Sequence, residues 1–252
     1  MDNRLRNVWA TESAGINAWL AMPSSVSAEV VSQHDFDSIT IDLQHGLVDY
    51  TSALPMLQAM VGSDATLMAR VPWLEAGVIM KMLDAGALGI ICPMINTREQ
   101  AEQFVGYCRY APLGERSFGP TRAISVHGVD YPSVANDQVI ALAMIETRTA
   151  LLNVDSIVAT PNLTGVYIGP SDLALSLGFV PKLDHDEPAV LDAIKTILAA
   201  AHSAGVKAGI HCLTPRYARS MIELGFDLVT MGSEMRALSA ALTDLVTEVR
   251  TS

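Results

Sequence analysis

The 252-residue chain has few cysteines and no long apolar run. Its three cysteines show neither a C-x-x-C pair nor a zinc-finger spacing, which excludes a disulfide framework and a structural zinc site and favours reduced thiols in the cytoplasm. The longest apolar runs, such as residues 87–95, stop well short of the roughly 20 residues that cross a bilayer. We therefore expect a protein without a membrane partner.

Positive charge is also scarce. There are 16 Lys and Arg against 27 Asp and Glu, so the net charge is −11. A nucleic-acid partner is not expected, because such binding needs clustered basic surface. Half of the residues are apolar, enough for a sizeable core. Arg4 and Arg6 precede an apolar segment like a secretory signal, but Glu12 and Asn17 interrupt it, so we predict a strand there.

Short β-branched runs alternate with helical segments along the whole chain, a pattern typical of a parallel sheet with crossover helices. The predicted strands are 17–22, 38–43, 65–71, 88–94, 140–146, 163–169, 207–213 and 226–232. The predicted helices are 28–33, 50–60, 74–85, 98–107, 148–159, 171–177, 188–204, 216–224 and 233–250. Eight such units predict an α/β fold, one (β/α)8 TIM barrel over residues 1–252. An open doubly wound sheet is the alternative, but no G-x-G-x-x-G motif follows the first strand.

One segment departs from this alternation. Residues 109–138 carry several glycines and prolines and no clear period, which predicts a loop of about 30 residues, a length that is usually functional or disordered. The segment joins a helix to a strand, so it belongs to the face opposite the chain's own active site. Any catalytic role would then lie in a neighbouring subunit.

Polar residues gather where the predicted strands end. Asp42 and His45 close the second strand, Arg70 the third and Glu146 the fifth, while Asp172 follows the sixth. In a TIM barrel these ends form the active face. Each residue alone is also consistent with a purely structural role. Glu146 and Asp172, for instance, stand at helix starts, where an acid caps free N–H groups and complements the helix dipole. Their coincidence at one end of the barrel favours a catalytic site.

The residue types indicate enolate chemistry next to a carbonyl group. Two carboxylates, Glu146 and Asp172, without imidazole or thiolate partners suit a hard divalent ion, Mg²⁺ or Mn²⁺ with Co²⁺ as a further option. Such an ion polarises a chelated oxoacid. His45, oriented by Asp42, is the predicted base, and Arg70 is predicted to neutralise the oxyanion. The four lysines, Lys81, Lys182, Lys195 and Lys207, are not placed for Schiff-base catalysis.

These residues occur in stretches that resemble the HpcH/HpaI family of metal-dependent pyruvate aldolases over essentially the whole chain. The stretches are FD (36–37), IDLQHG (41–46), MARV (68–71), LDAGA (83–87), RYAPLGER (109–116), IETR (145–148) and IGPSDL (168–173). The resemblance implies reversible cleavage of 4-hydroxy-2-oxoacids into pyruvate and an aldehyde.

The resemblance also implies a role for each matching residue. Glu146 and Asp172 would hold the metal, His45 would be the base, and Arg70 would stabilise the enolate. Asp42 and Asp84 would tune the base, with Asp84 acting from a neighbouring chain. Further contacts to substrate would come from Gly169, Pro170, Ser171 and Gln44. A homohexamer, built as a trimer of dimers with last helices that can exchange between chains, is implied as well.

Two positions depart from many relatives, which have glutamate in place of Gln44 and glutamine in place of Met144. The first change removes a negative charge beside the metal, and the second removes a hydrogen bond near the oxoacid. The donor substrate, pyruvate or hydroxypyruvate, is therefore left open. Three other readings also stay open: an oxaloacetate decarboxylase, a lyase of CoA thioesters, and a non-enzymatic oligomer that binds oxoacids.

Overall fold

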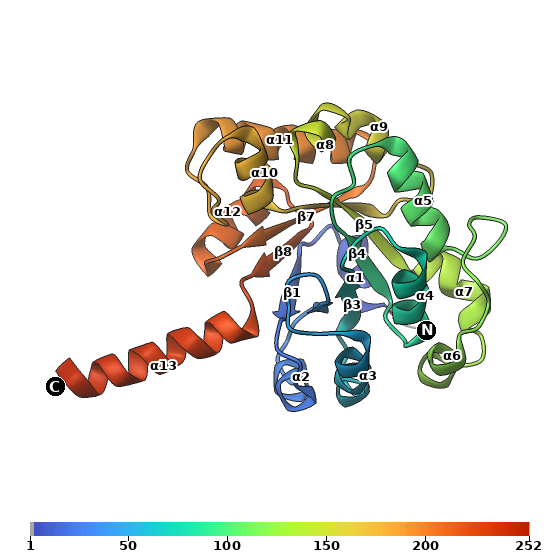
Figure 1. Ribbon diagram of the computed structural model, residues 1–252, viewed down its shortest axis with the longest axis horizontal. Coiled ribbons are helices and arrows are strands. Elements are labelled where there is room, and N and C mark those ends of the chain that lie inside the picture. Colours follow the sequence, from blue (N-terminus) through green and yellow to red (C-terminus); the bar gives the residue numbers. More distant parts are fainter. Residues whose placement is uncertain (1–2, 252) are drawn as a thin grey trace.

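The computed structural model describes residues 3–251 and shows a closed barrel of parallel strands (Figure 1). Each strand pairs with the next in chain order, and β8 pairs with β1. The strands are β1 (Gly15–Leu20), β2 (Ser38–Asp42), β3 (Thr66–Arg70), β4 (Gly89–Cys92), β5 (Ile140–Ile145), β6 (Gly165–Ile168), β7 (Lys207–Cys212) and β8 (Leu228–Met231). The predicted TIM barrel is confirmed, and closure of the sheet excludes the doubly wound alternative.

Helices alternate with the strands in the order expected of βα units. They are α1 (Arg4–Ala10), α2 (Ser25–Ser32), α3 (Tyr50–Ala59), α4 (Ala76–Asp84), α5 (Arg98–Cys108), α6 (Thr121–His127), α7 (Tyr131–Gln138), α8 (Arg148–Leu152), α9 (Val154–Val158), α10 (Pro170–Leu177), α11 (Pro188–Ser203), α12 (Pro215–Leu224) and α13 (Glu234–Thr251). Polar N-cap residues explain where α3 and α5 begin, because Asp49 and Thr97 each form a capping box there. Gly225 ends α12 at φ +114°, a left-handed conformation that favours glycine.

Burial on both faces accounts for the apolar strands. All six residues of β5 are buried, as expected of a parallel strand covered by helices outside and side chains inside. The interior holds large side chains such as Met68, Leu142 and Tyr167, so the barrel is a packed core.

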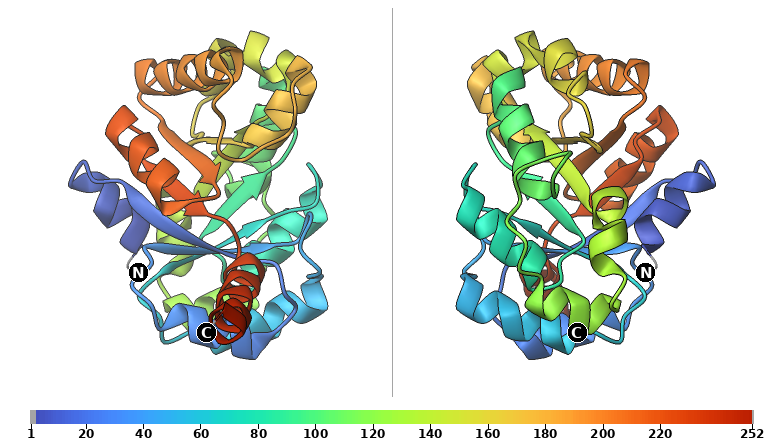
Figure 2. Two further views of the ribbon diagram at one scale, coloured as in Figure 1. Left: turned by 90° about the vertical axis from the view of Figure 1, so that its left-hand side faces the viewer. Right: turned by 90° about the vertical axis from the view of Figure 1, so that its right-hand side faces the viewer.

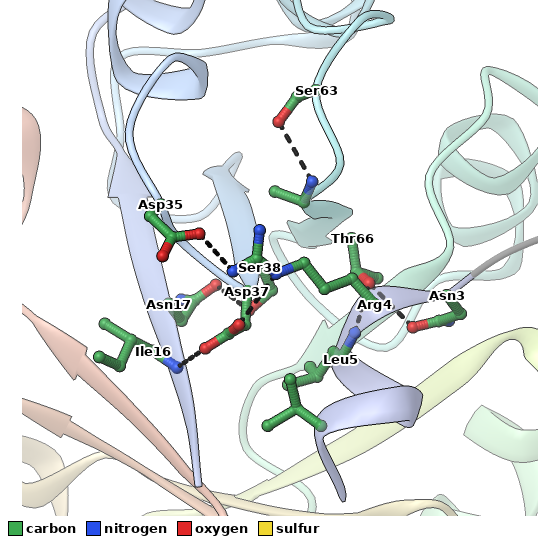
Figure 3. Close-up of polar contacts among 12 residues, drawn as sticks. Asn3, Arg4, Leu5, Ile16, Asn17, Asp35, Asp37, Ser38, Ser63 and Thr66 are labelled. Atoms are coloured by element: carbon green, nitrogen blue, oxygen red, sulfur yellow. Dashed lines mark hydrogen bonds and ion pairs between the residues drawn. The ribbon is translucent and has the colours of Figure 1, made fainter. Parts of the chain in front are cut away.

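A short helix not predicted from the sequence, α1, closes the N-terminal end of the barrel. Its Leu5 enters the interior beside Gly15, where a Cβ would lie 2.4 Å from a Leu5 methyl group. Polar contacts hold the helix in place: Thr66 Oγ1 accepts from the Leu5 N–H and donates to Asn3 Oδ1, and Arg4 pairs with Asp37 (Figure 3). This helix has only seven residues, so tertiary contacts stabilise it and the sequence is too short there to show a helical period.

The predicted loop over residues 109–138 is only partly a loop, because α6 and α7 form within it. Ala123, Tyr131 and Ala135 on these helices pack with Leu88 and Tyr110 in a separate apolar cluster. A second correction concerns the predicted helix 148–159, which divides at Asn153 into α8 and α9. Helices of five to eight residues are too short for a period to be read reliably from sequence.

The last helix, α13, extends away from the barrel, and none of its described residues is buried (Figures 1 and 2). One side carries an apolar row spaced four, three and four residues apart: Leu238, Leu242, Leu245 and Val249, each at least half exposed. Between residues 3 and 251, no helix combines the length and hydropathy needed to span a membrane.

Candidate active site

A cavity of about 340 Å³ opens at the C-terminal ends of the strands. Eight of the ten predicted site residues line it: Asp42, His45, Arg70, Glu146, Gly169, Pro170, Ser171 and Asp172. Met144, noted in the sequence as a departure from many relatives, also lines the cavity, and residues not singled out from the sequence complete the lining: Trp19, Ala21, Leu183, His211, Ser233 and Arg236. The barrel thus brings together side chains from distant parts of the chain.

Asp42 and Arg70 form an ion pair in the wall of this cavity. They end neighbouring strands and are register partners, so their side chains start side by side. Asp42 Oδ1 accepts from Arg70 Nε at 2.8 Å, and Oδ2 accepts from Nη2 at 2.6 Å. Although burial opposes ionisation of Asp42, the bonds from Arg70 lower the pKa of this carboxyl group. A charged, oriented guanidinium therefore faces the cavity.

Trp19, at the end of β1, supports the same pair. Its indole Nε1 donates to Asp42 Oδ2 at 3.2 Å, and the Arg70 guanidinium carbon lies 4.8 Å from the centre of its ring. The ring also stacks on Tyr167, with centroids 5.9 Å apart. Hydrogen bonding and cation–π contact together hold Arg70 from two directions.

His45 is exposed, and its ring makes no hydrogen bond with the described part of the chain. Asp42 Oδ1 accepts from the His45 backbone N–H at 3.3 Å, so Asp42 shapes the turn that carries His45. The sequence predicted that Asp42 orients the His45 imidazole. In the structure the Asp42 carboxylate instead accepts hydrogen bonds from the side chains of Arg70 and Trp19.

Glu146 is 2% exposed and points into the cavity beside Asp172. Its Oε1 accepts from the Met94 N–H at 2.8 Å, and Met94 adopts a left-handed φ of +57°. Burial chiefly, with a further contribution from the negative charge of Asp172, raises the pKa of Glu146 to about 7. Gly169 makes room for this carboxylate, because a Cβ there would lie 2.4 Å from Oε2.

These acids fit a divalent cation. Two carboxylates crowded together, one of them buried, are a strained arrangement that a positive ion relieves. No cluster of three or more His, Cys, Asp or Glu side chains suited to a metal occurs among residues 3–251. Glu146 and Asp172 are two acids that could hold a cation, with the other coordination positions left to water and ligand.

Two predicted site residues do not line the cavity. Asp84 ends α4 on the opposite face, where its Oδ1 accepts from Arg116 Nη2 at 2.7 Å. The Arg116 guanidinium is buried against Tyr110 and Tyr131, with its carbon 4.4 and 5.7 Å from their ring centres. Gln44 is half-buried, and its Oε1 has no hydrogen-bond partner in the described structure.

His211, Ser233 and Arg236 are polar lining residues to which the sequence assigned no role. His211 Nδ1 lies 3.2 Å from the Tyr167 hydroxyl, and its ring meets the Trp19 ring edge-on at 4.8 Å. Burial, followed by the charge of Arg70, lowers the pKa of His211 to about 3. The sequence feature that could have identified His211 as a site residue is its position near the end of the seventh predicted strand.

Comparisons with known proteins agree with this geometry. The family model described as HpcH/HpaI aldolase/citrate lyase matches residues 16–241. The chain belongs to this family. It is 40% identical to a hydroxypyruvate/pyruvate aldolase of Rhizorhabdus wittichii, covering 98% of this chain and 99% of that protein. It is 34% identical to a 5-keto-4-deoxy-D-glucarate aldolase of Klebsiella pneumoniae, covering 95% and 93%.

A solved structure extends the likeness to three dimensions. An HpcH/HpaI aldolase/citrate lyase family protein from Burkholderia cenocepacia superposes with a TM-score of 0.91 at 30% identity, covering 99% of this chain and all of that one. Family membership makes the chain an enzyme, a carbon–carbon lyase of the aldolase kind. The non-enzymatic reading of the sequence is thereby overturned.

Proposed function

We propose that this chain catalyses the reversible, divalent-metal-dependent aldol cleavage of 4-hydroxy-2-oxoacids into pyruvate or hydroxypyruvate and an aldehyde. The observation that carries the proposal is the convergence of Arg70, His45, Glu146 and Asp172 on one cavity. The aldolase names of the relatives support the reaction type. The likeness to a hydroxypyruvate/pyruvate aldolase supports pyruvate or hydroxypyruvate as the donor substrate. The presence of Gln44 and Met144, where many relatives have glutamate and glutamine, also leaves the donor open.

His45 and Arg70 perform complementary steps in this proposal. In cleavage, the C4 hydroxyl proton passes to the His45 imidazole, directly or through water, while the C3–C4 bond breaks and its electrons form the enolate. The enolate then takes up a proton at C3 to give the oxoacid. Arg70, held by Asp42 and Trp19, donates to the oxyanion that develops at C2. Fixed donors of this kind need no reorganisation during the reaction.

Glu146 and Asp172 are the proposed metal-binding residues, for Mg²⁺, Mn²⁺ or Co²⁺. The ion would supply Lewis acidity to the chelated oxoacid. Gly169, Pro170 and Ser171 begin α10 beside these acids and form the proposed binding surface for the oxoacid carboxylate. A helix N-terminus favours a negative group there. Gln44 does not line the cavity, so it is proposed to act on substrate only indirectly.

We also propose that the enzyme is a homo-oligomer, a hexamer arranged as a trimer of dimers. An apolar groove of about 690 Å³ runs between α2 and the first turns of α13, where Met22, Val26, Val30 and Leu238 contribute lining. Beyond Leu238, the residues of the apolar row of α13 (Leu242, Leu245 and Val249) are more than half exposed. The proposed occupant of the groove is α13 of a second copy. Asp84 would reach a neighbour's site from its position opposite the chain's own cavity.

The deciding experiment measures pyruvate release from a 4-hydroxy-2-oxoacid with added Mg²⁺, with EDTA, and after metal is restored. Loss in EDTA and recovery with metal support the proposal, while full activity in chelator contradicts it. A His45→Ala variant should lose turnover but still bind metal. Oxaloacetate and an acyl-CoA serve as competing substrates, and a higher kcat/KM for either would favour the decarboxylase or thioester lyase instead.

A further inference from the structure

A second cavity, of about 450 Å³, opens at the N-terminal end of the barrel. Its lining comes from α1, from the end of α7 and from the segments that lead into β6 and β7, together with Arg109 after α5. None of its lining residues also lines the cavity of the candidate active site, which lies at the other ends of the strands. A ligand bound here would therefore leave the candidate active site open.

Positive charge is concentrated around this second cavity. Arg6, Arg109 and Lys207 contribute to its lining, although the whole chain has only 16 Lys and Arg against 27 Asp and Glu. Asp137 is the one acid among the described lining residues, and it is exposed to solvent. This cavity in an acidic protein therefore carries an excess of positive charge, which favours a negatively charged ligand.

The guanidinium of Arg109 is buried in the wall of this cavity with unsatisfied donors. Arg109 is 2% exposed, and its Nη2 donates to two neutral oxygens, the Asn162 carbonyl at 3.1 Å and Thr164 Oγ1 at 3.3 Å. Its Nε and Nη1 have no hydrogen-bond partner in the part of the chain that the structure describes. A buried cation in this state costs free energy, which a negative charge nearby offsets. An anion in the cavity would supply that charge.

Arg6 and Lys207 retain donors for a ligand. Arg6 Nε and Nη2 donate to two backbone carbonyl groups at the end of α7, at 3.0 and 3.2 Å, and these neutral acceptors supply no countercharge. Burial, followed by the positive charge of Arg109, lowers the pKa of Arg6, so the two guanidinium groups lie close enough to repel each other. Lys207 Nζ donates to Asp227 Oδ1 at 2.7 Å, but an ammonium group has three donors and Asp227 does not line the cavity.

The size and lining of the cavity indicate the class of anion. A volume of about 450 Å³ lies within the usual range for small-molecule sites, about 300–1,000 Å³, so an organic group has room beside the charged one. Trp9 and Leu163 contribute apolar wall. A phosphate monoester carries close to two negative charges at pH 7 and several acceptor oxygens, so it can pair with more than one cation. The planar fork of arginine also matches phosphate oxygens.

We propose that the cavity at the N-terminal end of the barrel is a second ligand site, which binds a phosphate monoester of a small organic molecule. The phosphate group pairs with Arg6 and Lys207, while Arg109 adds positive charge from the buried wall. The organic part lies against Trp9. Because this site shares no residue with the candidate active site, the inference does not rest on the proposed aldol reaction.

The test measures the Kd of glycerol 3-phosphate for the full-length enzyme by titration calorimetry, with glycerol and inorganic phosphate as comparison ligands. Glycerol 3-phosphate should bind, inorganic phosphate should bind more weakly, and glycerol should not bind. Lys207→Gln should raise the Kd about 10-fold, as expected for losing a charged hydrogen bond. Lys182→Gln is the matched control, because it also removes a lysine paired with an aspartate but lies outside the cavity, and it should leave the Kd unchanged.

A second variant gives a gain that a folding defect would not produce. Asp137→Asn removes the exposed acid from the lining and should lower the Kd about two- to fivefold, the range for one exposed charge pair. Asp192→Asn, at an exposed acid of α11 outside the cavity, is its control and should leave the Kd unchanged.

Three results would overturn the inference. The first is no binding of glycerol 3-phosphate by the wild-type enzyme. The second is binding whose Kd changes in neither Lys207→Gln nor Asp137→Asn, because the ligand would then lie elsewhere. The third is equal affinity for glycerol 3-phosphate and inorganic phosphate, because the organic group would then make no contact. None of these results bears on the proposed aldol reaction, which the chelator experiment tests separately.

Discussion

The carboxylate of Asp42 binds the guanidinium of Arg70 at two points, between register partners that end neighbouring strands. Arg70 Nη1 makes no hydrogen bond with the described residues, so one nitrogen stays available to a ligand. The pair is nearly buried, with 4% of the Asp42 side chain and 12% of the Arg70 side chain exposed. Its integrity should govern both stability and catalysis.

Asp42→Asn should test this coupling. The change leaves a nearly buried guanidinium without its countercharge, so we expect a loss of about 3 kcal/mol in the free energy of unfolding and at least about a tenfold drop in kcat. Urea unfolding and steady-state kinetics measure the two effects. Asp35→Asn is the control, because Asp35 pairs with Arg4 but is 90% exposed, and its removal should cost less than about 1 kcal/mol. Equal losses in both variants would contradict the prediction.

Metal binding should depend on pH through Glu146. Its pKa is raised to about 7, so without metal this group stabilises the fold below about pH 4.5 and loses that contribution as pH rises through 7. A divalent cation displaces the proton, so Mn²⁺ or Mg²⁺ should raise the Tm more at pH 8 than at pH 6. Glu146→Gln should abolish this difference, while Glu102→Gln, on exposed α5 surface, should keep it. A pH-independent shift would argue against Glu146 as the ligand.

Gly169→Ala should weaken the same site without removing either acid. The new Cβ would lie 2.4 Å from Glu146 Oε2 and 3.1 Å from Met144 Cε, which forces the carboxylate to move. We expect at least about a tenfold higher Kd for metal, measured by titration calorimetry, as for other changes around metal ligands. Gly62→Ala introduces a Cβ into open space and is the control. Unchanged affinity in Gly169→Ala would mean that Oε2 does not contact the ion.

His211 should make the fold sensitive to acid. The unfolded chain protonates this group near pH 6.5, but the folded protein does so only near pH 3. Between these values unfolding takes up a proton, so the group lowers the free energy of unfolding by about 1.4 kcal/mol for each unit that pH falls. Urea unfolding at pH 6.5 and 5.0 should show a smaller decline in His211→Asn. An identical decline in both proteins would contradict the assignment.

Leu242→Asp should disturb assembly. Leu242 lies in the middle of the exposed apolar row of α13, and a charge there opposes burial in a partner's groove. Light scattering should show smaller species than the wild type, with far-UV circular dichroism unchanged. Asp244→Ala, on the same helix outside the apolar row, serves as the control. An unaltered mass for Leu242→Asp would remove α13 from the interface.

Sequence periodicity predicted the barrel because short apolar strand segments alternate with longer helical segments along the whole chain. It missed α1, whose stability comes from Leu5 and Trp9 packing at the bottom of the barrel. It also missed α6 and α7 for a similar reason, since contacts with Leu88 and Tyr110 stabilise them. Elements shorter than about three turns depend on packing that a local pattern does not contain.

The arrangement of the site could be predicted only in part from the sequence. Strand order alone predicted that Arg70, Glu146 and Asp172 would share one end of the barrel. It did not predict the partner of Asp42, because neighbouring strands can slide by a residue and the register that aligns Asp42 with Arg70 is a property of the whole sheet.

Helix α13 has consequences for protein engineering. Its opening turn is tied to Ala21 and Met22 through Glu234 and carries Arg236, while the later turns stand clear of the barrel. A truncation designed to test the proposed contact of α13 with a second copy must therefore retain residues up to about 237. Cutting earlier would also remove the Glu234 carboxylate from the backbone N–H groups of Ala21 and Met22, so a change in activity could not be ascribed to the distal turns of α13 alone.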